Sequence, residues 1–279
     1  MKKACVIGWP ITHSRSPLIH NYWLKLHGIA GQYDRVPVEP KDLSSFFTKF
    51  IAEGYCGCNV TIPHKESVFG FVGIADDATR RLGAVNTVFE RSGKILGTNT
   101  DGEGFLANLK SNTPNLDLRD KRVVLLGAGG AAMAIIGALI DEGAGEIAIA
   151  NRTLERGEEL RKRFGNRIRP ADWVLRGSAL VDSALLVNTT SLGMTGHPPL
   201  EIDLSLLPAG AVVADIVYSP LKTQLLQDAG ARGYRVVGGL GMLLHQAVRG
   251  FQLWFGTRPE VTEELYDLVA RDIDSDYRR

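Results

Sequence analysis

The glycine-rich run Gly127-Ala128-Gly129-Gly130-Ala131-Ala132 constrains the fold of this chain more than any other segment. It follows four apolar residues, Val123 to Leu126, and it precedes an apolar stretch. In the pattern G-x-G-x-x-G/A, the first glycine permits a tight turn and the second lets the backbone approach a pyrophosphate. The small third residue lets a helix pack on the strand. We therefore predict a strand, a turn and a helix that bind a dinucleotide; the alternative is a glycine-rich turn with no ligand.

The residues after the next predicted strand, 146–150, indicate which dinucleotide would bind. An NAD site carries an acidic residue there for the ribose 2′-hydroxyl, whereas arginine can bind the 2′-phosphate of NADP. This chain has arginines at both candidate positions, so NADP is the prediction, although Thr153 could simply cap the helix predicted over 153–164. The predicted cofactor residues of this half are Gly127, Ala128, Gly129, Gly130, Ala131, Asn151, Arg152, Thr153 and Arg156.

The uncharged stretch from Val123 to Ile140 is long enough to be considered as a membrane span, at about 18 residues. Its four glycines favour a buried strand that runs into a tight turn instead. At the start of the chain, the apolar residues after Lys2-Lys3 end at Pro10, which is too short for a signal peptide. We expect no membrane partner.

Composition narrows the function further. The 32 Lys and Arg balance 31 Asp and Glu, giving a net charge of +1, so nucleic acid is not the expected partner. Three cysteines, Cys5, Cys56 and Cys58, form no disulfide framework, which favours a reducing cytoplasm. Cys56 and Cys58 have no second pair to complete a zinc set. We also expect no metal at His13, His64 or His245.

Strands and helices alternate in both halves of the chain, which predicts parallel sheets with crossover helices in two α/β domains. In the first half we expect strands at 4–8, 32–38 and 58–62, helices at 17–26 and 42–52, and a hairpin of strands 87–90 and 95–98. A linker is expected near residues 111–115. In the second half we expect strands at 122–126, 146–150, 185–188, 212–216 and 236–237, and helices at 130–142 and 153–164. Residues 239–273 are helical in pattern, Gly256 is a predicted C-cap, and the polar tail 274–279 is expected to be unstructured.

Lys65 and Asp101 are the best acid/base pair of the first half. Lys65 follows Ile62-Pro63, where a central strand must stop, and Asp101 also follows a predicted strand. Alone, Lys65 could be a phosphate anchor, a Schiff-base amine, a proton donor or a surface cation. If the two pair, Asp101 orients the ammonium and binds a substrate hydroxyl. Lys65 must then release a proton more easily than free lysine, whose pKa is about 10.4.

Uncharged polar side chains lie at other predicted strand and helix ends. Hydroxyl and amide groups give directional hydrogen bonds without a charge, which suits a polyhydroxylated small molecule. Each alone could equally be a turn residue or a cap. These residues are Ser14, Ser16, Thr61, Asn86 and Gln246.

Taken together, these motifs resemble those of the shikimate dehydrogenase family of the aromatic amino-acid pathway, from about Val6 to about Phe255. In the first half the matching motifs are Gly8-Trp9-Pro10-Ile11 with His13-Ser14 and Ser16-Pro17, Asn59 to Lys65, Gly83 to Thr87, and Gly97 with Asn99 to Gly102. In the second half they are the glycine run, Asn151 to Thr153, Asn188 with Thr190, Asp215 with Tyr218 and Pro220, and Gly239 to Leu243 with Gln246.

The resemblance implies reversible NADPH-dependent reduction of 3-dehydroshikimate to shikimate, with Lys65 as the acid/base residue. It implies substrate contacts from Ser14, Ser16, Thr61, Asn86, Asp101, Tyr218 and Gln246, and cofactor contacts from Thr190, Ile216 and Gly239. It also implies a substrate-binding catalytic domain with a mainly parallel sheet at 1–102, a Rossmann NADP-binding domain at 103–238, and helices at 239–279 that return to the first domain. A monomer or a homodimer is expected.

Two rival functions stay open. A quinate/shikimate dehydrogenase that uses NAD would have the same fold, although Ser14, Ser16 and Arg152 argue against it. A non-catalytic ligand sensor is disfavoured because Lys65 and Asp101 are both present and no basic or DNA-binding segment is appended.

Overall fold

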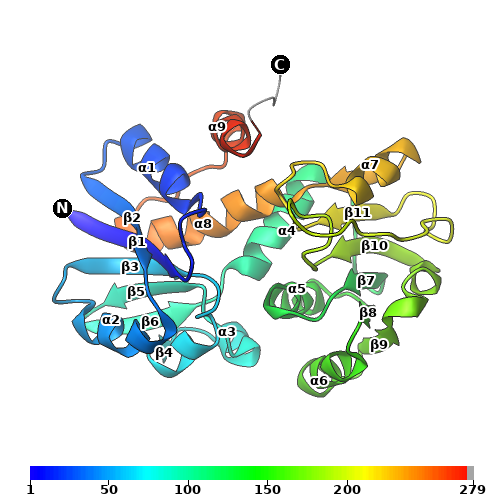
Figure 1. Cartoon of the computed structure of the whole chain (residues 1–279), viewed down its shortest axis with the longest axis horizontal. Coiled ribbons are helices and arrows are strands. Elements are labelled where there is room, and N and C mark those ends of the chain that lie inside the picture. Colours follow the sequence, from blue (N-terminus) through cyan, green and yellow to red (C-terminus); the bar gives the residue numbers. More distant parts are fainter. Residues whose placement is uncertain (275–279) are drawn as a thin grey trace. The chain divides into compact units, whose positions relative to one another are not determined.

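The computed structural model describes residues 1–274, which form two compact units (Figure 1). The first unit comprises Met1–Asp101 and Leu244–Val269. The second comprises Gly102–Leu243 together with the described residues 270–274. Residues 244–269 thus group with the N-terminal part of the chain, whereas 239–243 do not. The functional assignment of the three predicted parts stays a prediction, and 275–279 of the predicted tail lie outside the described residues.

The first unit is built on one mixed sheet of six strands in the order β2-β1-β3-β5-β6-β4. Their bounds are β1 (Lys2–Gly8), β2 (Gly31–Pro37), β3 (Tyr55–Val60), β4 (Gly73–Ile74), β5 (Thr87–Arg91) and β6 (Lys94–Thr98). β1 pairs in parallel with β2 and β3, and β4 with β6. The predicted hairpin is present, since β5 is antiparallel to both β3 and β6.

Helices cover both faces of this sheet because successive residues of a strand point to opposite faces, and residues 4–7 of β1 are all apolar and buried. Cys5 and Ile7 point toward a cluster with α2 (Leu43–Lys49), where Phe47 is buried. On the other face lie α1 (Ser16–Leu26) and the part of α8 (Gly239–Phe255) that belongs to this unit. Figure 1 shows α1 and α2 on opposite sides of the strands. The remaining helices are α3 (Asp77–Leu82) and α9 (Glu263–Ile273), the latter shared between the units.

A ring cluster holds α1 and α8 against the sheet. Trp254 of α8 is 1 % exposed and its indole N–H donates to Val88 O at 2.8 Å. A side chain at Gly57 would overlap that indole, so only glycine allows this approach. His20 of α1 is fully buried and stacks on Tyr33 at 4.2 Å. In residues 1–274, neither ring nitrogen of His20 has a hydrogen-bond partner.

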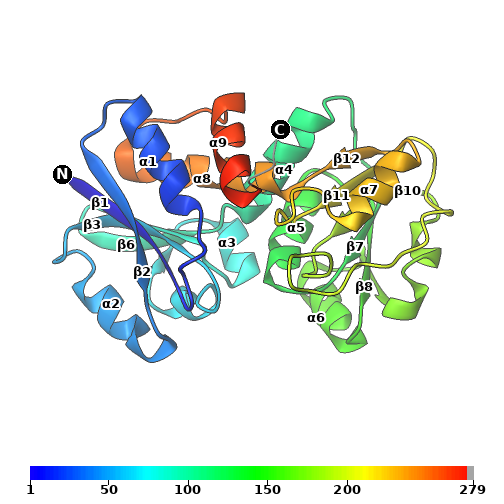
Figure 2. The same cartoon turned by 45° about the horizontal axis from the view of Figure 1, so that its top comes forward.

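The second unit has six parallel strands in the order β12-β11-β10-β7-β8-β9. This is the Rossmann order, with the switch point between β7 and β10. The strands are β7 (Arg122–Leu126), β8 (Glu146–Asn151), β9 (Ile168–Asp172), β10 (Ser183–Asn188), β11 (Val212–Asp215) and β12 (Arg235–Val237). Helices α4 (Asp101–Asn112), α5 (Gly130–Asp141) and α6 (Leu154–Phe164) pack on one face and α7 (Gln224–Ala231) on the other (Figure 2).

Several elements differ from the sequence-based expectations. The segment 123–140, considered as a membrane span, is divided between β7 and α5, and no helix among residues 1–274 is long and apolar enough to cross a bilayer. β3 ends at Val60, two residues before the predicted end, although Thr61 N still donates to Ile7 O at 3.0 Å. The helical stretch 239–273 is two helices, because Gly256 takes a φ of +84° after α8.

Four short 3₁₀ turns complete the described elements: η1 (Pro40–Asp42), η2 (Ser67–Gly70), η3 (Trp173–Leu175) and η4 (Ser178–Leu180). β4, β9, α3 and α7 were not expected from the sequence. All three cysteines lie in the first unit, where Cys5 and Cys58 are buried neighbours on β1 and β3 and form no disulfide.

The buried His20 makes the first unit sensitive to acid. Burial lowers the pKa of His20 from 6.5 to about 3, so below about pH 6.5 the unfolded chain binds a proton that the folded chain does not. The contribution of His20 to the free energy of unfolding is therefore fully present above this pH. It falls by up to about 1.4 kcal/mol per pH unit as the pH drops toward 3. In urea unfolding between pH 7 and 4.5, His20→Leu should flatten this slope. His197→Gln, at an exposed histidine, should leave the slope unchanged; an equally steep slope in His20→Leu would contradict the assignment.

Candidate functional site

The predicted substrate residues of the first unit gather at one edge of its sheet. Parallel β1 and β3 both end there, which places the loops carrying Ser14 and Thr61 side by side in the sheet order. Because β5 runs antiparallel to β3, it starts at the same edge, and Asn86 immediately precedes it. β6 returns to this edge at Thr98, so Asp101 follows there as well.

Lys65 and Asp101 form the ion pair that the sequence predicts. Lys65 Nζ lies 2.6 Å from Asp101 Oδ2, and the two side chains are 27 % and 10 % exposed. Val85 N donates to Lys65 O at 2.7 Å, which ties the lysine loop to the segment before Asn86. Asp101 is the first residue of α4, where the helix dipole favours a negative charge. One ammonium N–H is used in the pair, and a lysine has three.

Asn86 holds Asp101 from the other side. Its Nδ2 donates to Asp101 Oδ1 at 2.8 Å and to Thr100 Oγ1 at 3.1 Å, and it lies 3.5 Å from Gln246 Oε1. Its Oδ1 accepts from Thr100 N at 2.8 Å and from the Thr87 hydroxyl at 2.9 Å. These two donors fix the direction of the amide, so its N–H groups must face Asp101. Asn86 is 2 % exposed.

Ser14, Ser16 and Thr61 lie at the same edge without bonds to the ion pair. Ser14 Oγ accepts from Ser16 N at 3.3 Å, and Arg35 holds the loop by donating to Ser14 O. α1 has Arg15 at its N-cap and no side-chain cap bond. At the end of β1, a Cβ on Gly8 would lie 2.7 Å from Thr61 Cγ2, so glycine allows the loop to approach Thr61.

Two predicted substrate residues come from outside the N-terminal sheet. Gln246 lies on α8 within the first unit and is 9 % exposed, beside Asn86. Tyr218 follows β11 in the second unit, so it is not among the side chains that the first unit brings together.

Four buried polar residues behind the ion pair were not predicted as site residues: Tyr33, Asn59, Thr87 and Thr100. Tyr33 OH donates to Asn59 Oδ1 at 2.6 Å, and Asn59 Nδ2 lies 3.4 Å from Thr87 Oγ1. Thr87 and Thr100 then contact Asn86 directly. A signal was present, since Asn59, Thr87 and Thr100 all stand within the quoted motifs as polar residues next to strand ends.

The glycine run forms the predicted turn between β7 and α5. Gly127 takes a φ of +103°, and a Cβ there would lie 2.8 Å from Thr190 Cγ2. Gly129 is the N-cap of α5, and a Cβ on it or on Gly130 would meet no atom within 4 Å. The first amides of a helix have no partner within the helix and can bind an anion. Ala128 and Ala131 lie beside these glycines, and Ala132 packs in the core. The run therefore fits a pyrophosphate.

The start of α6 fits a phosphate next to the ribose. Asn151 ends β8 and its Nδ2 donates to Thr153 O at 2.7 Å. Thr153 occupies the expected N-cap of α6, but its side chain makes no cap bond. Arg152 and Arg156 are exposed, and within the described part of the chain neither has an ion-pair or hydrogen-bond partner for its side chain. Both guanidinium groups are thus available to an anion.

A third cluster lies at the ends of β10 and β11. Asn188 Oδ1 accepts from the Thr190 hydroxyl at 2.7 Å, and its Nδ2 donates to Asp215 Oδ1 at 3.0 Å. Burial raises the pKa of Asp215 to about 6, although three hydrogen bonds oppose that rise. Ile216 follows, and a Cβ on Gly239 would overlap its carbonyl group. The predicted cofactor residues Thr190, Ile216 and Gly239 are therefore placed by close backbone packing.

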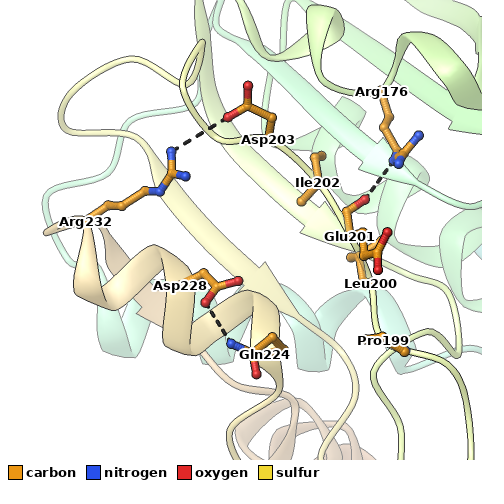
Figure 3. A pocket seen from close by; sticks show the side chains of 9 residues that line it. All are labelled: Arg176, Pro199, Leu200, Glu201, Ile202, Asp203, Gln224, Asp228 and Arg232. Carbon is orange, nitrogen blue, oxygen red and sulfur yellow. Dashed lines mark hydrogen bonds and ion pairs between the residues drawn. The ribbon is translucent and has the colours of Figure 1, made fainter.

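A pocket of about 660 Å³ elsewhere in the second unit contains none of the predicted site residues. Figure 3 shows that its charged side chains are directed at partners: Arg232 toward Asp203, and Arg176 toward Glu201 O. Gln224 likewise donates to Asp228 at 2.7 Å. Because Arg176 bonds the backbone oxygen of Glu201, the Glu201 carboxylate is the one charged group here for which no partner is seen among the lining residues, and we assign no function to this pocket.

Known family models match three segments of the chain. Residues 6–88 match the shikimate dehydrogenase substrate binding domain, residues 107–184 match shikimate / quinate 5-dehydrogenase, and residues 239–263 match the shikimate 5′-dehydrogenase C-terminal domain. Shikimate dehydrogenase (NADP(+)) of Methylocella silvestris is 53 % identical over 272 residues, which are 98 % of this chain and 97 % of the relative.

Solved structures agree. Shikimate 5-dehydrogenase from Thermus thermophilus, in complex with NADP(H) and shikimate, has a TM-score of 0.85 and 33 % identity over 98 % of this chain and all of its own. Quinate dehydrogenase from Corynebacterium glutamicum, in complex with NAD, has a TM-score of 0.88 and 29 % identity, covering 96 % of this chain and 99 % of its own. The predicted α/β fold with a Rossmann domain is confirmed.

Alanine substitutions at two glycines of the same turn should distinguish an effect on folding from an effect on cofactor binding. Gly127→Ala should lower the free energy of unfolding by about 1–3 kcal/mol, because of its positive φ and the contact with Thr190. Gly129→Ala should leave the thermal midpoint unchanged without ligand, since its Cβ meets open space, but it should weaken dinucleotide binding measured by calorimetry. Unimpaired dinucleotide binding by Gly129→Ala would show that the pyrophosphate does not lie on this turn.

Proposed function

Because this chain belongs to the shikimate dehydrogenase family, we propose that it catalyses the reversible NADPH-dependent reduction of 3-dehydroshikimate to shikimate. The observation that carries the proposal is the partly exposed Lys65–Asp101 pair at 2.6 Å, at a sheet edge that also presents uncharged amides and hydroxyls. Lys65 and Asn86 lie in the segment that matches a substrate binding domain, residues 6–88, and Asp101 follows that segment. The enzyme is an oxidoreductase, as the family is.

The chemistry assigned to the residues is a proton transfer. NADPH, when bound, supplies the hydride for the carbonyl carbon. Lys65 gives a proton from Nζ to the carbonyl oxygen, and in the reverse direction it takes the proton of the alcohol. Asp101 accepts one N–H of Lys65 and thereby directs the ammonium, while its contact with Asn86 keeps the carboxylate in place.

Binding of the substrate is assigned to the uncharged groups around the pair. Ser14, Ser16 and Thr61 supply hydroxyls at the ends of β1 and β3, and Asn86 and Gln246 supply amides. Shikimate carries several hydroxyls and a carboxylate, and such groups accept or donate directional hydrogen bonds. Tyr218 is retained as a further proposed substrate contact.

NADP is the proposed cofactor. The turn Gly127–Gly130 would receive its pyrophosphate, and Asn151, Arg152, Thr153 and Arg156 its adenosine 2′-phosphate. Two exposed arginines, one directly after β8 and one in the first turn of α6, support a phosphate over a 2′-hydroxyl, because an NAD site uses an acidic residue after this strand. Thr190, Ile216 and Gly239 are proposed to lie near the nicotinamide. The protein is proposed to act in chorismate biosynthesis in the cytoplasm, as a monomer or a homodimer.

Oxidation of quinate with NAD is the second candidate, supported by the likeness to a quinate dehydrogenase in complex with NAD. A single assay separates the two: the absorbance of reduced cofactor is followed with shikimate or quinate, each with NADP or NAD. The proposal expects the highest kcat/KM for shikimate with NADP. Preference for quinate with NAD would favour the second candidate, and no turnover with any pair would favour a ligand sensor.

Lys65→Ala should lower kcat for shikimate oxidation by about 100- to 10,000-fold, the range typical of a lost general acid/base. The affinity for NADP should change little. Lys41→Ala is a matched control, because Lys41 also pairs with an acidic residue, Glu39, in the first unit but at an exposed site. Steady-state kinetics and calorimetry measure both effects, and normal turnover by Lys65→Ala would exclude the assigned role.

Arg152→Ala should weaken NADP binding by about 10- to 100-fold, since a charge-assisted bond to phosphate is lost. Binding of NAD, which has no 2′-phosphate, should fall far less. Arg119→Ala, at an exposed arginine paired with Asp117, serves as the control. Equal losses for the two dinucleotides would contradict a phosphate contact at Arg152.

A further inference from the structure

Asp76 forms more contacts than a helix cap requires. It is the N-cap of α3, and its Oδ1 accepts from Thr79 N at 2.8 Å and from the Thr79 hydroxyl at 2.7 Å. Its Oδ2 accepts from Thr98 Oγ1 at 2.6 Å, and Arg249 Nη2 lies 3.7 Å away. One bond to a backbone N–H is enough to cap a helix. The other contacts connect Asp76 with β6 and α8.

A first connection runs from Asp76 to the backbone of Asp101. The Thr79 hydroxyl gives its only hydrogen to Asp76, so its lone pairs face Asn99 N, which donates to it at 2.9 Å. Asn99 Oδ1 in turn accepts from Asp101 N at 3.0 Å. Asn99 Nδ2 donates to Ala84 O at 3.0 Å, two residues before Asn86. Three consecutive hydrogen bonds therefore lead from Asp76 to Asp101.

A second connection runs from Asp76 to Gln246. Arg249 and Gln246 are three residues apart on α8, so they lie on the same face of that helix. Burial acts to raise the pKa of Asp76, but hydrogen bonds from Thr98 and Thr79 and the charge of Arg249 outweigh it and hold the pKa below its ordinary value. Asp76 is thus charged at neutral pH and attracts Arg249.

We propose that Asp76 and Thr79 are positioning residues that set the place of Asp101 and Gln246 at the substrate site. Neither touches the Lys65–Asp101 pair, and they act through Asn99 and Arg249. This role rests on the proposed function, because it assumes that Asp101 and Gln246 meet the substrate. A role limited to capping α3 is the alternative.

Two substitutions distinguish the roles because they keep the cap. Asn is as good an N-cap as Asp, so Asp76→Asn retains the bond from Thr79 N but removes the charge that faces Arg249 and the oxygen that accepts from the Thr98 hydroxyl. Thr79→Val retains the backbone N–H that bonds Asp76 and removes the hydroxyl that donates to Asp76 and accepts from Asn99 N. Thr79→Ser restores that hydroxyl. A matched control is Thr113→Val, which removes a buried hydroxyl bonded to Leu109 O at 2.5 Å in the second unit.

Steady-state kinetics give the first readout. Thr79→Val should lower kcat/KM for shikimate by about 10-fold, as for a displaced site residue, and leave KM for NADP within about twofold. Thr79→Ser should recover most of this loss, and Thr113→Val should behave as the wild type. Asp76→Asn should also lower kcat/KM for shikimate, through a higher KM. Wild-type kinetics in Thr79→Val, or losses of equal size in Thr113→Val, would overturn the proposal.

Amide hydrogen exchange of the ligand-free protein gives a readout that needs no substrate. The Asp101 amide should exchange about 10-fold faster in Thr79→Val than in the wild type, and no faster in Thr113→Val or Thr79→Ser. Unchanged exchange at Asp101 would overturn the positioning role whatever the enzyme oxidises. If the wild type turns over neither shikimate nor quinate, the proposed function fails, while faster exchange at Asp101 would still support the connection.

Discussion

The antiparallel pairing of β5 with β3 is the constraint on which the first unit's site depends. Asn59 pairs with Thr87 at the start of β5, and Thr87 pairs with Thr98 at the end of β6. Had β5 entered in parallel, Asn86 and the β6 end would stand at the opposite edge from the loops after β1 and β3. The reversal instead puts Asp101 within reach of Lys65, which closes an ion pair across 36 residues of chain.

Burial of polar groups makes this arrangement rigid. Asn59, Asn86, Thr87 and Thr100 are each at most 5 % exposed, and an unpaired polar group in such a place would cost about 1–3 kcal/mol. The hydrogen bonds among them satisfy these groups only in one orientation of the Asn86 amide. Polar pairing behind the site therefore specifies the geometry of the acid/base pair in front of it.

The parts of the fold that depend on local signals could be predicted, and those that depend on distant contacts could not. The glycine turn and the β5–β6 hairpin are each specified by residues that are close together in the sequence, so both could be predicted. β9 was missed because it is an edge strand with Arg169 and Pro170 in its middle, and an edge tolerates proline. The six residues of α3 are too few for a helical period. Gln246 is predicted from the sequence as an amide near a helix end, but its place beside Asn86 follows only from the packing of α8, which no local pattern encodes.

All three cysteines lie in the first unit, so thiol-specific reagents can modify the first unit and not the second. Cys5 and Cys58 are fully inaccessible on adjacent strands, and burial, with a contact from Cys58, raises the pKa of the Cys5 thiol well above its ordinary range. Alkylating reagents attack the thiolate, so neither sulfur can react until β1 and β3 separate. The rate at which a maleimide modifies these two thiols thus reports how often the sheet of the first unit opens. Opening of the Rossmann sheet does not contribute to this rate, because the second unit has no cysteine.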